Sequence, residues 1–136
     1  MSGVHVRVRV AGEHYAIPVD EVREVGEPGQ LTPVPGARAE VLGVSNLRGE
    51  VLPIIDLAAL LGMRDAGGPE RVVIVARDER SAGLAVGEVV DVGEVPEPSE
   101  EADSAYLSGA ALFDGTLTGV VDVGAVLDAL AGETVR

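Results

Sequence analysis

The 136-residue sequence predicts an all-β protein made of two small β-barrels that are fused side by side. Its apolar fraction is 46% but aromatic residues make up only 2%, so the core must be built from aliphatic side chains, chiefly valine. Such β-branched packing favours strands over helix bundles. The chain also contains an internal repeat, and each copy holds enough short apolar segments for a small barrel. Because half a chain of this size would be marginal alone, we expect the barrels to share a core.

The repeat is visible when the chain is aligned with itself at an offset of 66 residues. Residues 40–57 then lie over residues 106–123, and at an offset of 67 residues Val19–Val25 lies over Val86–Val92. The matching positions are Gly43 with Gly109, Gly49 with Gly115, Ile54 and Ile55 with Val120 and Val121, and Asp56 with Asp122. An ordered series of this kind indicates a duplication, which chance similarity between valine-rich strands does not explain.

The first copy is expected to begin with strands. Residues 1–10 alternate apolar and polar side chains, which predicts a strand, and a second strand is expected at Tyr15–Ile17. We expect a short turn or helix at Val19–Val25, followed by a proline-containing loop. Two further strands, Gly43–Leu47 and Val51–Ile55, are predicted to be joined by a tight turn.

Each copy is expected to end in a short helix that follows a capping aspartate and stops at a glycine. The predicted caps, helices and stops are Asp56, Leu57–Leu61 and Gly62 in the first copy, and Asp122, Val123–Ala131 and Gly132 in the second. Residues 63–70 join the copies. We therefore place the first barrel at about residues 12–66 and the second at about residues 67–136, with strand exchange by the N-terminal segment.

The hairpin turns of the two copies differ in their chemistry. The second copy uses Asp114-Gly115, a pair that suits the positive φ angles of a tight hairpin turn. The first copy has Arg48-Gly49 at the matching position, and arginine is a poor turn former. Departures from local turn chemistry are where functional residues tend to lie, so Arg48 is a candidate functional residue. The alternative is a solvent-exposed hairpin tip.

The charge balance excludes several kinds of partner. The net charge is −13, every basic residue is arginine, and aromatic residues are nearly absent. The chain therefore lacks phosphate-neutralising stripes and base-stacking platforms, which argues against nucleic acid and anionic membrane as partners. No apolar run reaches transmembrane length, and the N-terminal residues have a strand pattern in place of a signal peptide. We expect a cytoplasmic protein without direct membrane insertion.

No motif predicts an enzyme, a metal site or a cofactor. There is no cysteine, no Gly-x-Ser-x-Gly segment and no lysine for a phosphate-binding loop. His5 and His14 have no nucleophile or metal ligand at a useful spacing. Asp56 and Asp122 resemble a symmetric carboxylate pair, but helix capping explains both, and a small hydrolase built on them is the weakest alternative.

Three consecutive stretches form a signature: Val34-Pro-Gly-Ala37, Val41-Leu-Gly-Val-Ser-Asn-Leu-Arg-Gly49 and Val51-Leu-Pro-Ile-Ile-Asp-Leu57. Val22–Val25 precedes them and Tyr106–Gly109 follows them. In this order they resemble the chemotaxis coupling proteins, the CheW family, over almost the whole chain. The resemblance implies two SH3-like barrels around a shared core, which agrees with the duplication.

The resemblance also implies a non-enzymatic adaptor without a cofactor, recruited to membrane-receptor arrays. Such proteins bind the regulatory domain of a histidine kinase and the cytoplasmic hairpin tip of methyl-accepting chemoreceptors, and so take part in two-component signal transduction. The alternative is a peptide- or small-molecule-binding double barrel outside chemotaxis.

Two sets of residues follow as expected binding sites. For the kinase, the resemblance points to the first barrel, and we expect contacts near Val34, Pro35 and Leu42. For the receptor, we expect an aliphatic groove between the barrels with Arg48 at its edge, because a guanidinium can clamp carboxylates or carbonyls. The expected receptor residues are Arg48, Asn46, Val22, Val25, Val89 and Val92. Core packing is the alternative for the four valines.

Overall fold

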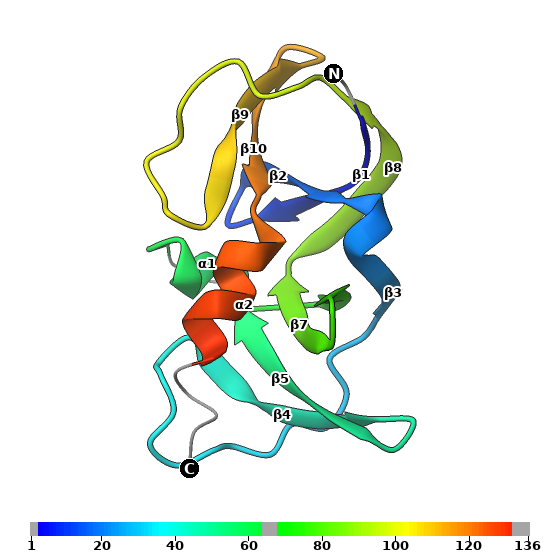
Figure 1. Ribbon diagram of the computed structural model, residues 1–136, viewed down its shortest axis with the longest axis vertical. Coiled ribbons are helices and arrows are strands. Elements are labelled where there is room, and N and C mark those ends of the chain that lie inside the picture. Colours follow the sequence, from blue (N-terminus) through cyan, green and yellow to red (C-terminus); the bar gives the residue numbers. More distant parts are fainter. Residues whose placement is uncertain (1–2, 64–67, 132–136) are drawn as a thin grey trace.

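The computed structural model describes residues 3–63 and 68–131, which form ten strands, two α-helices and one short 3₁₀ helix (Figure 1). In the first copy the elements are β1 (Gly3–Val10), β2 (Glu13–Pro18), η1 (Val19–Glu21), β3 (Val22–Gly26), β4 (Val41–Leu47), β5 (Glu50–Asp56) and α1 (Leu57–Leu60). In the second copy they are β6 (Arg71–Arg77), β7 (Arg80–Val86), β8 (Glu88–Val95), β9 (Leu107–Phe113), β10 (Thr116–Val121) and α2 (Val123–Ala131). The all-β class predicted from the valine-rich composition is confirmed.

The strands form two five-stranded sheets, each of which is strongly curved (Figure 1). We call the sheet with the order β3-β6-β7-β5-β4 the first barrel and the sheet with the order β8-β1-β2-β10-β9 the second barrel. Each has a single parallel pair among its described strands, β5 with β7 and β2 with β10. The two barrels therefore repeat one topology, as the duplication predicts.

The strands are divided between the barrels differently from the expected boundary at residues 66 and 67. The β6–β7 hairpin of the second copy lies in the first barrel, and the β1–β2 hairpin of the first copy lies in the second barrel. The physical reason is burial: each hairpin carries an apolar face, such as Val6 and Val8 on β1, that this exchange places between the barrels. The boundary residues 64–67 lie outside the described residues.

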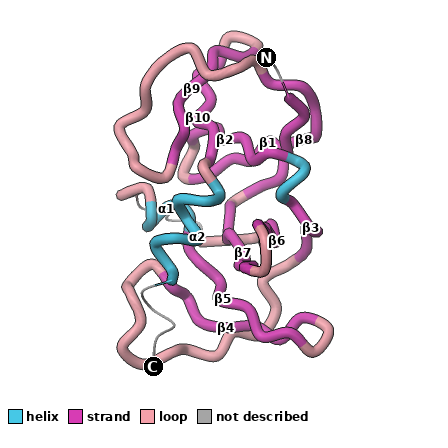
Figure 2. Tube along the Cα trace, viewed as in Figure 1, coloured by secondary structure: helices cyan, strands magenta, loops and turns pink. Residues whose placement is uncertain are grey.

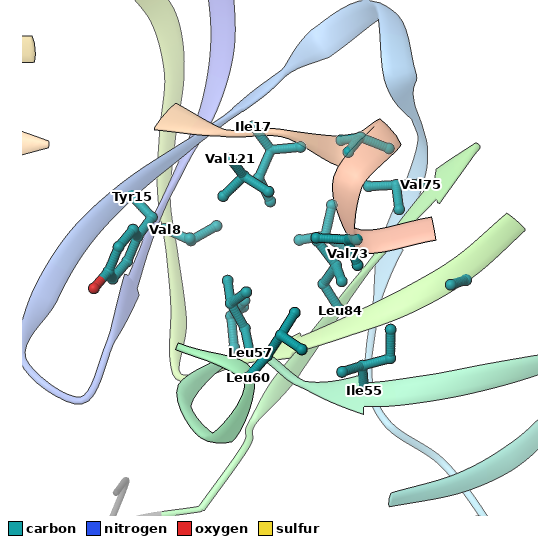
Figure 3. Packing of buried hydrophobic residues seen from close by; sticks show 14 of the residues in the cluster. Val8, Tyr15, Ile17, Ile55, Leu57, Leu60, Val73, Val75, Leu84 and Val121 are labelled. Carbon is teal, nitrogen blue, oxygen red and sulfur yellow. The ribbon is translucent and has the colours of Figure 1, made fainter. Parts of the chain in front are cut away.

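The predicted shared core lies between the two barrels (Figure 3). Val8 and Ile17 come from the second barrel, and Val73 and Leu84 come from the first. Both helices also contribute to it and lie between the barrels (Figure 2). The first barrel has a smaller interior core of its own, formed by Leu52, Ile54, Val72, Ile74 and Ala85.

The segment Val19–Val25 was predicted as a turn or helix, and this is only partly correct. A single 3₁₀ turn spans Val19–Glu21, and the chain then continues as strand β3. Antiparallel pairing with β6 overrides the local preference because it places Val22 and Val25 opposite core residues of β6. Neither helix among the described residues has the length and apolar character needed to cross a membrane.

The predicted helix caps are present at both helices. The Asp56 Oδ1 atom accepts a hydrogen bond from the Ala58 N–H at 3.1 Å, and the Asp122 Oδ1 atom accepts one from the Ala125 N–H at 3.0 Å. Gly62 follows α1 with a left-handed φ of +80°, as a helix stop requires. The second predicted stop, Gly132, lies outside the described residues.

Candidate functional site

Arg48 lies at the tip of the β4–β5 hairpin in a left-handed backbone conformation. Its φ is +50° and that of Gly49 is +86°, and the matching turn in the second barrel has Asp114 at +54° and Gly115 at +78°. Both hairpins therefore use a turn with two left-handed residues. For a residue with a long side chain this conformation costs about 1 kcal/mol. Arg48 is thus held where local turn chemistry disfavours it.

The tertiary structure pairs the Arg48 side chain with Glu24. The Arg48 Nη1 atom forms an ion pair with Glu24 Oε1 on strand β3, across the two edge strands of the first barrel. The Arg48 side chain is nevertheless 74% exposed, so this contact contributes at most about 1 kcal/mol and leaves other guanidinium donors facing solvent. Sequence reasoning did not single out Glu24, because the pair joins residues 24 positions apart through the curvature of the sheet.

Asn46 shapes the turn that carries Arg48. Its side-chain Oδ1 accepts a hydrogen bond from the Gly49 N–H at 2.9 Å, while the side chain itself is exposed. Such an Asx-type bond stabilises a turn locally. Asn46 therefore stabilises the hairpin turn, in addition to its expected contact with the receptor.

The four valines predicted for the receptor groove occupy equivalent positions in the two barrels. Val22 lies opposite Val75 and Val89 opposite Val8, and both pack against the shared core. Val25 and Val92 lie two pairs further along the same edge strands and are 41% and 59% exposed. The second pair therefore extends the apolar face of the shared core to the solvent, whereas the first pair belongs mainly to the packing.

A cleft with a volume of about 520 Å³ opens where the β1–β2 turn meets the starts of β6 and β8. Val89 lines this cleft, together with Arg9 and Arg71. Val22, Val25, Val92 and Arg48 are not among its lining residues. The structure thus brings the four valines to the margins of the shared core, but it does not gather all the expected receptor residues in one cleft.

The residues expected to contact a kinase lie on the loop before β4 and on β4 itself. Val34 and Pro35 are exposed on that loop, and Leu42 is half-buried against the interior core of the first barrel. The loop crosses β4 through a bridge between Thr32 and Val44, with backbone hydrogen bonds of 2.8 and 2.9 Å. Two of the three side chains are therefore accessible, and the third supports the strand beneath them.

Arg38, which sequence reasoning missed, ties this loop to the second copy. Its Nη1 atom donates to the Ala129 carbonyl of α2 and its Nη2 atom to the Tyr106 hydroxyl, both at 3.4 Å. Hydrogen bonds to Tyr106 and then to Glu40 raise the pKa of Arg38. The Glu40 carboxyl has a lowered pKa, mainly because its own backbone N–H donates to it and also because Arg38 lies beside it. The feature of the sequence that could have identified Arg38 is that it is the single arginine of the proline-containing loop.

Three of the side chains considered for catalysis, Asp56, Asp122 and His5, make structural contacts. Asp56 and Asp122 accept the helix-capping bonds described above. The His5 Nδ1 atom lies 2.7 Å from the Gly3 carbonyl oxygen, which accounts for its orientation. Among the described residues, no group of three or more His, Cys, Asp or Glu side chains is arranged to hold a metal ion.

Comparison with known proteins identifies the family to which the chain belongs. Residues 5–131 match the family model described as the CheW-like domain. The chain is 33% identical to the chemotaxis protein CheW of Rhizobium meliloti over 131 residues, covering 89% of the chain and 84% of the relative. It is 35% identical to the probable chemotaxis protein CheW of Rhizobium etli over 139 residues, covering 95% and 87%. The crystal structure of the scaffolding protein TtCheW from Thermoanaerobacter tengcongensis superposes with a TM-score of 0.81 at 29% identity, covering 90% of this chain and 86% of that one.

Proposed function

The chain belongs to the CheW-like domain family and is a chemotaxis coupling adaptor, and we propose that it works without catalysis by binding a histidine kinase and chemoreceptors at the same time. The observation that carries the proposal is the Asn46–Gly49 turn, which presents an exposed guanidinium at some cost in backbone energy. The match to chemotaxis proteins over most of the chain favours this function over a double barrel outside chemotaxis. We expect the protein in the cytoplasm, recruited to receptor arrays.

The proposed receptor contact combines one cation with an apolar margin. The exposed guanidinium of Arg48 can donate to carboxylates or carbonyls of a receptor hairpin, and Glu24 holds it pointing across the end of the first barrel. Val25 and Val92 offer exposed apolar surface at the edge of the shared core, which suits the apolar face of a helix. Val22 and Val89 support this surface from within.

The test of the receptor contact is Arg48→Ala. We expect receptor binding to weaken at least about tenfold while the free energy of unfolding changes by less than about 1 kcal/mol, because the exposed ion pair contributes little. Alanine tolerates this backbone position, since Ala11 has a φ of +51° in the β1–β2 turn. Folding, kinase binding and receptor binding are measured separately.

The matched control is Asp114→Ala, which changes the same turn position in the second barrel. Receptor binding should be unchanged in this variant. A general loss of stability in Arg48→Ala would assign Arg48 a structural role and move the receptor site elsewhere, and equal losses of receptor binding in both variants would have the same consequence.

The test of the kinase contact is Val34→Asp. Val34 is exposed on the loop before β4, so the charge should weaken kinase binding and leave folding and receptor binding intact. Titration of the purified kinase regulatory domain against the parent and variant proteins measures the effect. An unchanged kinase affinity would remove this loop from consideration.

A further inference from the structure

Arg38 joins three parts of the molecule through one guanidinium group. It lies on the loop between β3 and β4, where its Nε atom donates to Glu40 Oε1 at 3.1 Å. Its Nη1 atom donates to the Ala129 carbonyl of α2 and its Nη2 atom to the Tyr106 hydroxyl, both at 3.4 Å. Figure 1 shows the loop passing beside the C-terminal end of α2. Arg38 therefore connects a loop of the first barrel to two segments of the second copy.

The acceptors of these hydrogen bonds suit a fixed cation. Ala129 lies in the last turn of α2, and the final four carbonyls of a helix have no donor within the helix. A cation at this end also interacts favourably with the helix dipole. The planar guanidinium holds its donors in a rigid fork, which allows one side chain to serve several acceptors. The Arg38 side chain is 32% exposed, whereas that of Arg48 is 74% exposed, so Arg38 is the more enclosed of the two.

The segment of the loop before Arg38 has few other contacts that could fix its conformation. Residues 32–36 are exposed, so apolar packing does not hold them. The backbone bridge from Thr32 to β4, with hydrogen bonds of 2.8 and 2.9 Å, anchors the start of the segment. The side-chain hydrogen bonds of Arg38 anchor its end. Val34 and Pro35, which we expect to contact the kinase, lie between these two anchors.

The matching position of the second copy makes a different contact. Ser104 corresponds to Arg38 at the offset of 66 residues. The Ser104 hydroxyl oxygen accepts a hydrogen bond from the Tyr106 N–H at 3.1 Å, which stays within its own loop. Among the described residues, the connection from this position to the other copy is therefore a feature of the first copy, whose loop carries the expected kinase contact.

We propose that Arg38 is a positioning residue for kinase binding: by tying the loop of residues 27–40 to α2 and Tyr106, it holds Val34 and Pro35 in the conformation that the kinase binds. This inference rests on the proposed kinase contact. A loop that is ordered before binding loses less conformational freedom when the partner docks, so the same contacts give a higher affinity. Arg38 acts through the loop, and its guanidinium stays on α2 in the complex.

The first test is Arg38→Met, which keeps the aliphatic stem and removes the guanidinium. We expect the purified kinase regulatory domain to bind at least about tenfold more weakly, and receptor binding to change less than about twofold. The matched control is Arg80→Met, because Arg80 also donates to α2, at Asp128 Oδ1 and 2.6 Å, but from the start of β7. Kinase binding should be unchanged in this control, and urea unfolding checks that both variants are folded. Equal losses of kinase binding in the two variants would overturn the proposal.

Tyr106→Phe separates positioning from a direct contact between Arg38 and the kinase. Loss of the hydroxyl loosens the loop but leaves the guanidinium in place, so kinase binding should weaken about threefold or more. Tyr15→Phe is its control, because the Tyr15 hydroxyl donates to Met63 Sδ and not to this loop. If Arg38→Met weakened kinase binding and Tyr106→Phe did not, Arg38 would contact the kinase itself and the proposal would be wrong.

Amide hydrogen exchange reports on the loop without the kinase. The Ala37 N–H donates to the Val34 carbonyl at 3.2 Å, inside the segment that Arg38 anchors. In Arg38→Met its exchange should be at least about tenfold faster, whereas exchange at Leu84 in the shared core should change much less. Unchanged exchange at Ala37 would overturn the proposal.

A double-mutant cycle connects the loop to the kinase. In a protein that already carries Val34→Asp, Arg38→Met should change kinase affinity less than about twofold, because both substitutions act through one loop. Additive losses would overturn the positioning role. Weakened binding in Val34→Asp together with normal binding in Arg38→Met would remove that role alone, whereas normal binding in Val34→Asp would remove the kinase contact as well.

Discussion

Gly43 and Gly109 show how a single missing Cβ atom allows a loop to cross a barrel. Both residues have φ angles in the left-handed region, +148° and +156°. A Cβ atom on Gly43 would lie 2.6 Å from the Thr32 carbonyl oxygen, and one on Gly109 would lie 2.9 Å from the Glu100 carbonyl oxygen. These are the carbonyls through which the two loops bridge to β4 and β9. The pair found by aligning the chain with itself therefore has one physical cause in both copies.

We expect Gly43→Ala to lower the free energy of unfolding by about 3 kcal/mol or more, because backbone strain and a clash with the loop add together. Gly49→Ala is the matched control: its φ is also positive, at +86°, but no atom lies near the added Cβ. It should cost about 1 kcal/mol. Urea unfolding of both variants measures the difference, and equal losses would show that the loop moves freely away from β4.

The lowered pKa of the Glu40 carboxyl leads us to expect that the free energy of unfolding depends on pH. Its own backbone N–H and the neighbouring Arg38 lower its pKa in the folded state. A lowered folded-state pKa means that the stabilisation is present above the unfolded pKa and is lost as the pH falls through the folded pKa. The stability difference between the parent and Glu40→Gln should therefore be present at neutral pH and shrink as the pH falls below about 4.5.

Urea unfolding of both proteins at a series of pH values measures this difference directly. Comparing the two proteins cancels the effect of the other carboxylates, whose protonation also relieves the repulsion within a chain of net charge −13. A difference that stays constant from neutral to acidic pH would show that the Glu40 carboxylate does not stabilise the fold.

At the scale of elements, the two helices show that the two copies of the repeat are equivalent in how their helices begin. Both begin after an aspartate whose side chain accepts a backbone hydrogen bond in the first turn. We expect Asp56→Ala and Asp122→Ala each to cost about 1 kcal/mol of unfolding free energy and to leave partner binding unchanged. Loss of partner binding with unchanged stability would instead show that these carboxylates act at a surface.

The edge strand β3 shows where the local sequence was insufficient to predict the secondary structure. Val19–Val25 contains acidic residues and valines that fit either a turn or a strand, and only pairing with β6 makes Val22–Gly26 extended. The hairpin strands were easier to predict, because a tight turn between two apolar runs fixes their register locally. Arg48 could be found by comparing two turns, whereas its partner Glu24 could not, because the curvature of the sheet brings the two together.

At the scale of the whole molecule, the exchanged hairpins make each barrel depend on both copies. The β6–β7 hairpin completes the first barrel and the β1–β2 hairpin completes the second. The shared core draws on both barrels and both helices. Neither copy can therefore bury its apolar face alone, which makes the protein one folding unit.

We expect a single cooperative unfolding transition with equal calorimetric and van't Hoff enthalpies. Leu84→Ala in the first barrel and Ile17→Ala in the second should each lower the unfolding free energy by about 2–5 kcal/mol and shift that same transition. Differential scanning calorimetry of the parent and both variants checks this. Two separate transitions, each moved by only one of the variants, would contradict the proposed unit.

The sequence by itself determined the strand class, the duplication, the capped helices and the unusual turn at Arg48. These features depend on side-chain periodicity, turn chemistry and capping, which act over a few residues and repeat at equivalent positions. Only the tertiary structure decided which hairpins are exchanged, that Glu24 meets Arg48, and that Val22 and Val89 are half-buried while Val25 and Val92 are exposed. Each of these depends on which segments, distant in sequence, pair to bury the most apolar surface, and no local pattern encodes that choice.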